Sequence, residues 1–521
     1  MKRAIIGLVG ALAAFLTGCA AFDYPGSMNM SSAAPSQMVA CSGGPRSAPV
    51  DGARNPSSSG LGAISMASLV DTFHDEPVRS FTLTAQVVDR PGLPQEWTFN
   101  GTVPGPEIRV TKGDHVHVTL VNRLPDGVTI HWHGVRIPNA EDGVAGLTQD
   151  AVPPGGTYSY DFIAKDAGTF WYHSHEKTFQ EVPRGLFGSL VVEDPDSPKP
   201  DRDFTVVYHD SQDVSITGFK LVLRILSQRF GRNTRSETEV DGRPAERLVA
   251  RPGELVRVRI VNAIAGEMPG APLRLAVIGS DAVLRAIDSH DINEPQPIGK
   301  RLLVLGMGQR FDLELRMPAQ GGVVIRDPDQ TETLTIGDSE EAALGAAALG
   351  AGISRWPALD LHTYGTPVAG ALGARTRFNA TYPLVLGEKP GRRMGTIQLV
   401  HTINGKAFPD IPEIRVTEGE TVKLHIVNGT NEYHPMHLHG HVFTVLAVDG
   451  KPMTGSPIRE DSVLVEPHGS ADVAFVADNP GLWMFHCHVL LHAAFGMDMM
   501  VVYPGIQTPY TVGTDSNNIP E

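Results

Sequence analysis

"VTKGDHVHVTLVN" at residues 110–122 recurs as "VARPGELVRVRIVN" at 249–262 and as "VTEGETVKLHIVN" at 416–428. Each copy has a turn with glycine, an acidic residue and then alternating apolar positions that end in Val-Asn. Alternation with a period of two is typical of a half-buried β-strand. Because long stretches separate the copies, they predict three repeated domains rather than a solenoid.

The composition favours an all-β fold. The chain has Gly 55 and Pro 40, which suits many short strands joined by turns, and such chains form β-sandwiches. We therefore expect an all-β protein with three sandwich domains in tandem. The expected segments are a signal peptide at 1–18, a flexible tether at 19–70, domain 1 at 71–195, domain 2 at 200–336, a connector at 337–377, domain 3 at 378–505 and a tail at 506–521.

The N-terminus reads as an export signal. Lys2 and Arg3 precede an apolar run that is too short to span a bilayer and that ends in Leu16-Thr17-Gly18-Cys19. That ending resembles a bacterial lipobox, which implies cleavage before Cys19 and lipidation of this cysteine. An ordinary secretory signal is the alternative. In either case we expect export to the cell envelope, and with the lipid we expect a membrane anchor facing the periplasm or the exterior.

Paired histidines distinguish the three repeats. "GTFWYHSH" (168–175) matches "GLWMFHCH" (481–488), and "HWHG" (131–134) matches "HLHG" (437–440), whereas the second repeat has no histidine at these places. Residues i and i+2 of a strand face the same side, so each pair presents two imidazoles together. Eight imidazoles from domains 1 and 3 could thus enclose a metal cluster. They are His131, His133, His173, His175, His437, His439, His486 and His488.

Cys487 lies between His486 and His488, so its side chain should point the opposite way, into the core of domain 3. There it can meet further residues that suit copper. Two histidines, one cysteine and a weak axial methionine form a blue-copper electron-transfer site. The candidates are His434, Cys487, His492 and Met497.

With "HWHG", "HSH", "HPMHLHGH" and "HCHVLLHAAFGM", the sequence resembles a three-domain multicopper oxidase of the laccase-like family over about residues 75–505. The resemblance implies three cupredoxin-like Greek-key sandwiches and four copper ions. It places type 1 copper on His434, Cys487, His492 and Met497, type 2 copper on His131 and His437, and the type 3 pair on His133, His173, His175, His439, His486 and His488.

The resemblance also implies a reaction. A reducing substrate gives single electrons to type 1 copper near the surface, where the imidazole of His434 or His492 is the expected exposed edge. Electrons pass from Cys487 to its neighbouring histidines and then to dioxygen, which becomes water. The net charge of −15 argues against a nucleic-acid partner, and we expect a monomer.

Proton supply departs from the family pattern. Relatives often have an acid inside or just after the H-C-H-x-x-x-H turn, but here the residues are Val489, Leu490, Leu491, Ala493 and Ala494. Asp142, in an Asp-Gly step after the first motif, is the expected proton relay or partner of the type 2 site. Asp498 is a more distant candidate. Glu432 could contact the substrate.

Other histidines are expected to have no role in copper binding. His115 and His117 should lie on the solvent side of a strand, His441 should be structural, and His468 should be exposed in a loop. The absence of a methionine-rich insert favours phenols or aromatic amines as substrates. The alternatives are a cuprous oxidase for copper tolerance and, in another class, a copper-binding envelope protein with little turnover.

Overall fold

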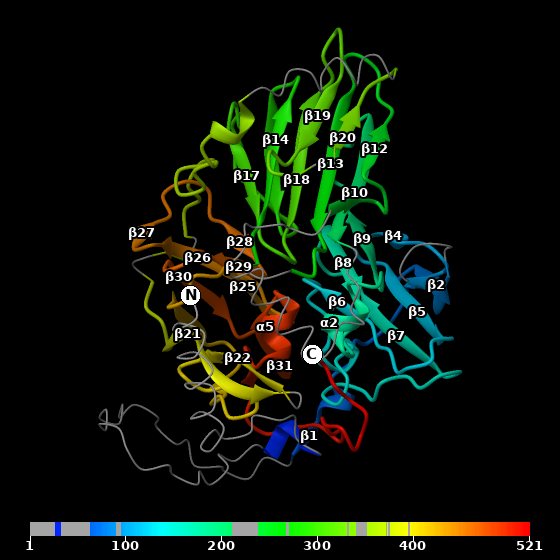
Figure 1. Cartoon of the computed structure of the whole chain (residues 1–521), viewed down its shortest axis with the longest axis vertical. Helices are drawn as coiled ribbons and strands as arrows, with labels where there is room; N and C mark the ends of the chain where they lie inside the picture. The colour runs from blue at the N-terminus through cyan, green and yellow to red at the C-terminus, as the bar shows by residue number, and fades with distance from the viewer. Residues whose placement is uncertain are drawn as a thin grey trace, which may run out of the picture.

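The computed structural model describes residues 27–32, 63–89, 95–210, 238–266, 270–330, 333–339, 352–370, 372–373, 376–393 and 396–521. The chain is mostly β and forms three cupredoxin domains, each built from two sheets, as the sequence predicted. In Figure 1, domain 2 stands above domains 1 and 3, which lie side by side.

Domain 1 packs two four-stranded sheets face to face. One sheet has the order β3-β2-β5-β7 and the other has the order β4-β9-β8-β6. The strands are β2 (Val78–Val88), β3 (Glu96–Phe99), β4 (Gly105–Thr111), β5 (His115–Asn122), β6 (His131–His133), β7 (Thr157–Ile163), β8 (Gly168–His173) and β9 (Phe187–Glu193). Two short helices, η3 (Asn139–Glu141) and α2 (Thr178–Glu181), follow β6 and β8.

Domain 2 has sheets of the orders β11-β10-β13-β18-β15-β16 and β12-β20-β19-β14-β17. The strands are β10 (Arg202–Asp210), β11 (Thr238–Val240), β12 (Ala245–Leu248), β13 (Leu255–Asn262), β14 (Leu273–Ile278), β15 (Ala282–Ile287), β16 (His290–Asp291), β17 (Leu302–Leu305), β18 (Arg310–Arg316), β19 (Val323–Arg326) and β20 (Thr333–Ile336). The turn between β17 and β18 reaches the other two domains, because Gly308 lies against His133 of domain 1 and His488 of domain 3.

Domain 3 repeats the plan of domain 1. Its sheets have the orders β22-β21-β24-β30-β26-β27, with β28 beside β26, and β23-β32-β31-β25-β29. The strands are β21 (Ala380–Arg393), β22 (Thr396–Ile403), β23 (Ile414–Arg415), β24 (Thr421–Asn428), β25 (His434–Leu438), β26 (Phe443–Val448), β27 (Lys451–Pro452), β28 (Arg459–Glu460), β29 (Ser462–Val465), β30 (Ser470–Val476), β31 (Leu482–Cys487) and β32 (Asp498–Val502). Helix α5 (Leu490–Ala494) follows β31, and η4 (Ile353–Arg355) precedes the domain.

The three sequence repeats form the same strand in each domain. Strands β5, β13 and β24 each pair in parallel with one neighbour and antiparallel with another. The asparagine that ends each repeat is buried, and its side-chain amide donates to at least two backbone carbonyls of later segments. This satisfies buried backbone acceptors, which explains why the repeats share Asn122, Asn262 and Asn428.

Two described parts of the predicted tether pack against the last residues of the chain. Strand β1 (Ile64–Ser65) pairs with β33 (Ile506–Gln507), and Met28 forms a bridge with Val512. The buried side chains of η1 (Met30–Ser32) and η2 (Met66–Ser68) include Met30 and Met66.

The predicted signal peptide and the lipidated cysteine, Cys19, lie outside the described residues, as does Cys41. In the part of the chain that is described, no helix has the length and hydropathy needed to cross a membrane.

Candidate metal centre

The eight paired histidines come together where domains 1 and 3 meet. In domain 1, His131 on β6 pairs with His173 on β8, and in domain 3, His437 on β25 pairs with His486 on β31. The two domains therefore present their imidazoles from equivalent strand pairs with the same register. All eight side chains are buried.

The imidazoles form one continuous cluster, in which the closest rings are His133 and His437 at 3.7 Å and His131 and His439 at 3.9 Å. Two trios and one pair can be distinguished within it. The rings of His133, His173 and His488 have centroids 4.9–5.8 Å apart. The rings of His175, His439 and His486 are 5.0–5.4 Å apart. His131 and His437 remain, one from each domain, with centroids 5.8 Å apart. Ring nitrogens of the cluster lie within 4.8 Å of one another in several overlapping triplets, so the cluster is suited to hold more than one metal ion.

Unpaired nitrogen atoms face the interior of this cluster. Among the described residues, one ring nitrogen has no hydrogen-bond partner in each of His131, His133, His173 and His437. In His175 and His488, both ring nitrogens have none. His439 Nε2 and His486 Nε2 lie 3.1 Å apart. A buried nitrogen without a partner is costly, and a metal ion would satisfy it.

Burial favours the neutral form of the imidazoles, which is the form that binds metal. Desolvation is the largest cause, neighbouring imidazoles add to it, and the pKa is lowered in seven of the eight, although Asp461 raises it in part for His133 and His437. The seven are His133, His173, His175, His437, His439, His486 and His488. Imidazole is a good ligand for copper, so the cluster fits copper ions.

Two aspartates hold the cluster ligands in an equivalent way from the two sides. Asp142 accepts a hydrogen bond from His131 Nδ1 through its backbone oxygen and from His439 Nδ1 through its carboxylate, each at 2.9 Å. Asp461 accepts from His437 Nδ1 through its backbone oxygen at 2.9 Å and from His133 Nε2 through its carboxylate at 3.0 Å. Each aspartate thus joins a ligand of its own domain to one of the other.

Asp142 was predicted to lie beside the cluster, whereas Asp461 was missed by the sequence reasoning. Asp142 follows His131 by 11 residues, but Asp461 follows His437 by 24. Because the intervening loops differ in length, spacing gave no signal that Asp461 was the counterpart.

The predicted type 1 residues form a second buried group. Cys487 Sγ lies 3.6 Å from His434 Nδ1 and 3.6 Å from His492 Nδ1, and the two nitrogens are 3.2 Å apart. Met497 is buried beside them, and its backbone oxygen accepts a hydrogen bond from the Cys487 backbone N–H. Burial raises the pKa of the Cys487 thiol, so a bound metal would have to displace its proton.

The comparisons with known proteins agree with this geometry. Residues 83–197 and 381–505 each match a family described as multicopper oxidase. "Multicopper oxidase MmcO" of Mycobacterium tuberculosis is 28% identical over 85% of this chain and 91% of its own length. "Laccase-1" of Botryotinia fuckeliana is 29% identical over 84% of this chain and 83% of its own length.

A solved multi-copper oxidase from Pseudomonas Thermotolerans is 30% identical, with a TM-score of 0.66, and the match covers 82% of this chain and all of that one. The chain belongs to the multicopper oxidase family. It is therefore a laccase-like oxidase that uses dioxygen as electron acceptor. The structure of Fet3p, at 19% identity and a TM-score of 0.65, shares the fold.

In this multicopper oxidase the type 1 imidazoles are buried, so the prediction that His434 or His492 has an exposed edge is wrong. Both outer nitrogens are already in contact with neighbouring side chains. His434 Nε2 lies 2.8 Å from Thr430 Oγ1, and His492 Nε2 lies 3.2 Å from Glu432 Oε2. The ring of His401 stacks on His492 at 4.0 Å.

Glu432 lies beside the type 1 group, but its carboxylate contacts histidines. It accepts a hydrogen bond from His401 Nε2 at 3.1 Å and is 4% exposed. Burial alone would raise the pKa of Glu432, but His401 and His492 together hold it well below its ordinary value. His401 gave no sequence signal, because it comes from β22, far from every copper motif in the chain.

A second buried acid, Glu521, reaches the cluster from the end of the chain. Its Oε1 lies 3.1 Å from His486 Nδ1 and 4.0 Å from His175 Nε2. Backbone groups of residues 519 and 520 bond to Glu176, Lys177 and Thr178, which holds this segment against domain 1. Sequence reasoning treated residues 506–521 as a tail and missed this contact.

The remaining histidines behave as expected. His115 and His117 are half-buried on β5 and share Asp161. His441 is buried and contacts Tyr503 Oη at 2.8 Å, which is a structural role. His468 is exposed in a loop.

The more distant candidate acid, Asp498, is buried on β32 and pairs in register with His486. Asp498, which the sequence analysis named as a candidate acid, therefore lies close to the cluster in the fold.

Proposed function

We propose that this protein couples one-electron oxidation of phenols or aromatic amines at a type 1 copper site to four-electron reduction of dioxygen to water at a three-copper cluster. The observation that carries the proposal is the convergence of eight imidazoles, with unpaired nitrogens facing one another, next to a Cys487 that faces the other way. The relative named "Laccase-1" supports the choice of substrate class.

The proposal assigns four copper ions to named residues. His434, Cys487, His492 and Met497 would hold type 1 copper. His131 and His437, the pair with one member from each domain, would hold type 2 copper. The two trios would hold the type 3 pair, and they consist of His133, His173 and His488, and of His175, His439 and His486.

Copper supplies one-electron transfer at a thiolate site and dioxygen reduction at an imidazole cluster. The chain connects the two places directly, because Cys487 and its neighbours, His486 and His488, are consecutive residues. The alternation of strand β31 sends the thiol into domain 3 and the two imidazoles into the cluster. Electrons therefore have a short covalent path between the sites.

Asp142 is proposed to serve the cluster as a proton relay. Its carboxylate contacts His439 Nδ1 at 2.9 Å and His131 Nδ1 at 3.2 Å, so it touches a ligand from each domain. The residues around α5, from Val489 to Ala494, contain no carboxylate.

Steady-state oxygen uptake by the copper-loaded protein tests the proposal. A phenol, an aromatic amine and Cu(I) should be compared as electron donors at matched concentrations. Uptake with the organic donors is the expected result. Uptake with Cu(I) alone would replace the phenol proposal by a cuprous oxidase for copper tolerance. No uptake with any donor would leave a copper-binding protein with little turnover.

We also propose that the protein is exported and anchored to the envelope through lipid on Cys19. The sequence Leu16-Thr17-Gly18-Cys19 after a short apolar run supports this. Metabolic labelling with a fatty acid should mark the wild-type protein. The Cys19→Ala variant should lose both the label and the membrane fraction, and an unlabelled wild-type protein would contradict the anchor.

A further inference from the structure

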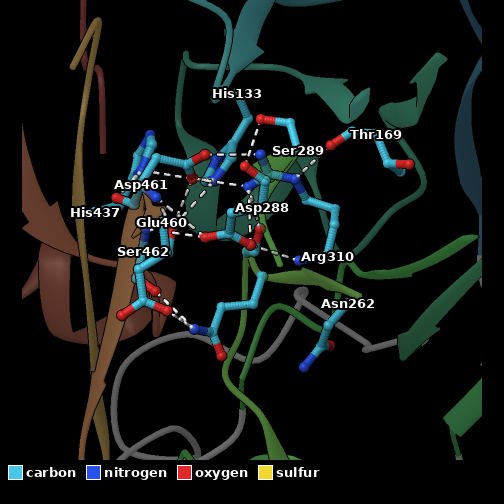
Figure 2. A network of polar contacts seen from close by, with 12 residues as sticks. His133, Thr169, Asn262, Asp288, Ser289, Arg310, His437, Glu460, Asp461 and Ser462 are labelled. Carbon is cyan, nitrogen blue, oxygen red and sulfur yellow. Dashed lines mark hydrogen bonds and ion pairs between the residues drawn. The ribbon is translucent and has the colours of Figure 1, made fainter. Parts of the chain in front are cut away.

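Domain 2 contributes no histidine to the cluster, yet one of its turns forms part of the cluster wall. Residues 306–309 connect β17 to β18. Figure 2 shows Arg310, the first residue of β18, in one polar network with Asp461 and His133. A Cβ atom added to Gly308 would lie 3.0 Å from His133 Cε1 and 3.1 Å from His488. Domain 2, whose repeat has no histidine at the ligand positions, therefore reaches the ligands themselves.

Arg310, at the end of this turn, joins all three domains. Its guanidinium is fully buried, and Nε donates to the backbone oxygen of Thr169 in domain 1 at 3.0 Å. Nη1 donates to Gly308 O in its own domain at 3.2 Å. Nη1 and Nη2 each donate to one carboxylate oxygen of Asp461 in domain 3, both at 2.7 Å. This is the two-pronged geometry that arginine makes with a carboxylate.

The Asp461 carboxylate, which Arg310 contacts, also accepts a hydrogen bond from a cluster ligand. Asp461 Oδ1 accepts the hydrogen bond from His133 Nε2. A histidine that donates from Nε2 keeps a lone pair on Nδ1, and His133 Nδ1 is the atom without a hydrogen-bond partner among the described residues. Asp461, together with Ser462 Oγ at 3.2 Å from the same nitrogen, thus leaves His133 Nδ1 free to face the cluster.

Domain 2 also fixes the backbone around Asp461. Asp288 Oδ2 accepts hydrogen bonds from the backbone N–H groups of Asp461 and Ser462 at 3.1 and 3.2 Å. Gln309 Nε2 donates to Ser462 O at 2.8 Å. Domain 2 therefore holds Asp461 through its carboxylate and also through the main chain of residues 461 and 462.

The equivalent aspartate on the other side of the cluster is held differently. The Asp142 carboxylate contacts His131 and His439, both of them cluster ligands. Only the Asp461 side is joined to an arginine in the described part of the chain. The two halves of the cluster therefore differ in their dependence on domain 2.

We propose that Arg310 is a positioning residue for the three-copper cluster. It orients Asp461 and, through Asp461, the imidazole of His133, so that domain 2 helps to set the geometry of a centre to which it gives no ligand. This inference rests on the ligand assignment proposed above.

The chain provides a matched control in Arg259, a second buried arginine of domain 2. Its guanidinium makes a two-pronged contact with Asp203 at 2.8 and 2.9 Å and also bonds to Asp312 and to the Thr169 side chain. Arg259→Met and Arg310→Met each remove a buried arginine from two carboxylates, Asp203 and Asp312 in the first case and Asp461 and Asp288 in the second. Only Arg310→Met frees a carboxylate that bonds to a cluster histidine.

The experiment compares copper-loaded wild type, Arg259→Met, Arg310→Met and Arg310→Lys. It measures copper per chain, type 1 absorbance, the type 2 electron paramagnetic resonance signal and the near-ultraviolet band of the coupled pair. Arg310→Met should keep the type 1 absorbance and weaken copper binding at the cluster by about 10- to 100-fold. Arg259→Met should stay within about twofold of wild type. Arg310→Lys should fall in between, because an ammonium cannot form both contacts.

The inference is overturned if Arg310→Met retains the cluster signals to the same extent as Arg259→Met, or if Arg310→Lys restores them fully. If Arg310→Met does not fold, Arg310→Lys is used in its place. The measured quantity is then the ratio of the cluster signals to the type 1 absorbance in folded protein, and a ratio equal to that of wild type overturns the inference. A wild-type protein that fails to bind four copper ions would instead contradict the ligand assignment, which separates the two failures.

Discussion

Gly308→Ala should damage the copper cluster from a domain that supplies none of its ligands. Gly308 has φ +84°, and the added Cβ would lie 3.0 Å from His133 Cε1 and 3.1 Å from the ring of His488. Carbon atoms in contact prefer about 3.5–4.0 Å, so the two rings must move by about 0.5 Å or more. Because both rings lie against the added Cβ, both proposed ligands of one copper ion would be displaced.

The magnitude follows from two separate costs. A left-handed conformation costs alanine about 1 kcal/mol of stability relative to glycine. A displacement of 1 Å in a catalytic group costs about 100-fold in rate, so a shift of half that size should lower kcat for oxygen uptake about tenfold. Cluster copper should be lost in parallel, while type 1 absorbance is retained.

Gly253→Ala separates these costs. Gly253 is also in domain 2, its φ is +82°, and a Cβ added there would have no atom within 4 Å. It should show the same loss of stability and unchanged oxygen uptake. The assay is kcat together with copper per chain for both variants. If Gly308→Ala keeps kcat and cluster copper within about twofold of Gly253→Ala, the turn does not constrain the cluster.

Cys487→Ser should abolish the blue absorbance while the three-copper cluster still binds metal, since the thiol faces away from the cluster histidines; retained colour would refute the type 1 assignment. Glu432→Gln should raise the type 1 potential by tens of millivolts, because it removes a buried negative charge 3.2 Å from His492 Nε2. Redox titration of the blue band measures this, and an unchanged or lower potential contradicts it. Burial raises the pKa of Glu141 from 4.5 to about 7, so its contribution to stability is present below about pH 4.5 and lost as the pH rises through 7. Glu141→Gln should therefore be more stable than wild type at pH 8 by up to about 3 kcal/mol, with little difference at pH 4.5. Thermal unfolding at the two pH values tests this, and an equal difference at both would contradict it.

Much of the copper chemistry could be predicted because it depends on local geometry. A strand alternates its side chains, so the spacing of His486, Cys487 and His488 determines which side each one faces. The repeats with their Val-Asn ends indicated three domains, and the histidine pairs indicated which two of them carry ligands. These inferences require only a few neighbouring residues.

Other features depend on contacts between distant segments, and spacing carries no information about them. Asp461 contacts His133 across 328 residues, and Arg310 contacts Asp461 across 151. The burial of His492 depends on His401 and Glu432, which the sandwich brings to it from other strands and loops.

By itself, therefore, the sequence determined the fold class and the residue types that bind copper, because strand periodicity and histidine pairing are local. Only the tertiary structure decided which nitrogen of ligands such as His131 and His133 is left for the cluster. That choice is made by hydrogen-bond partners such as Asp142 and Asp461, which lie close to the ligands only after the domains have packed.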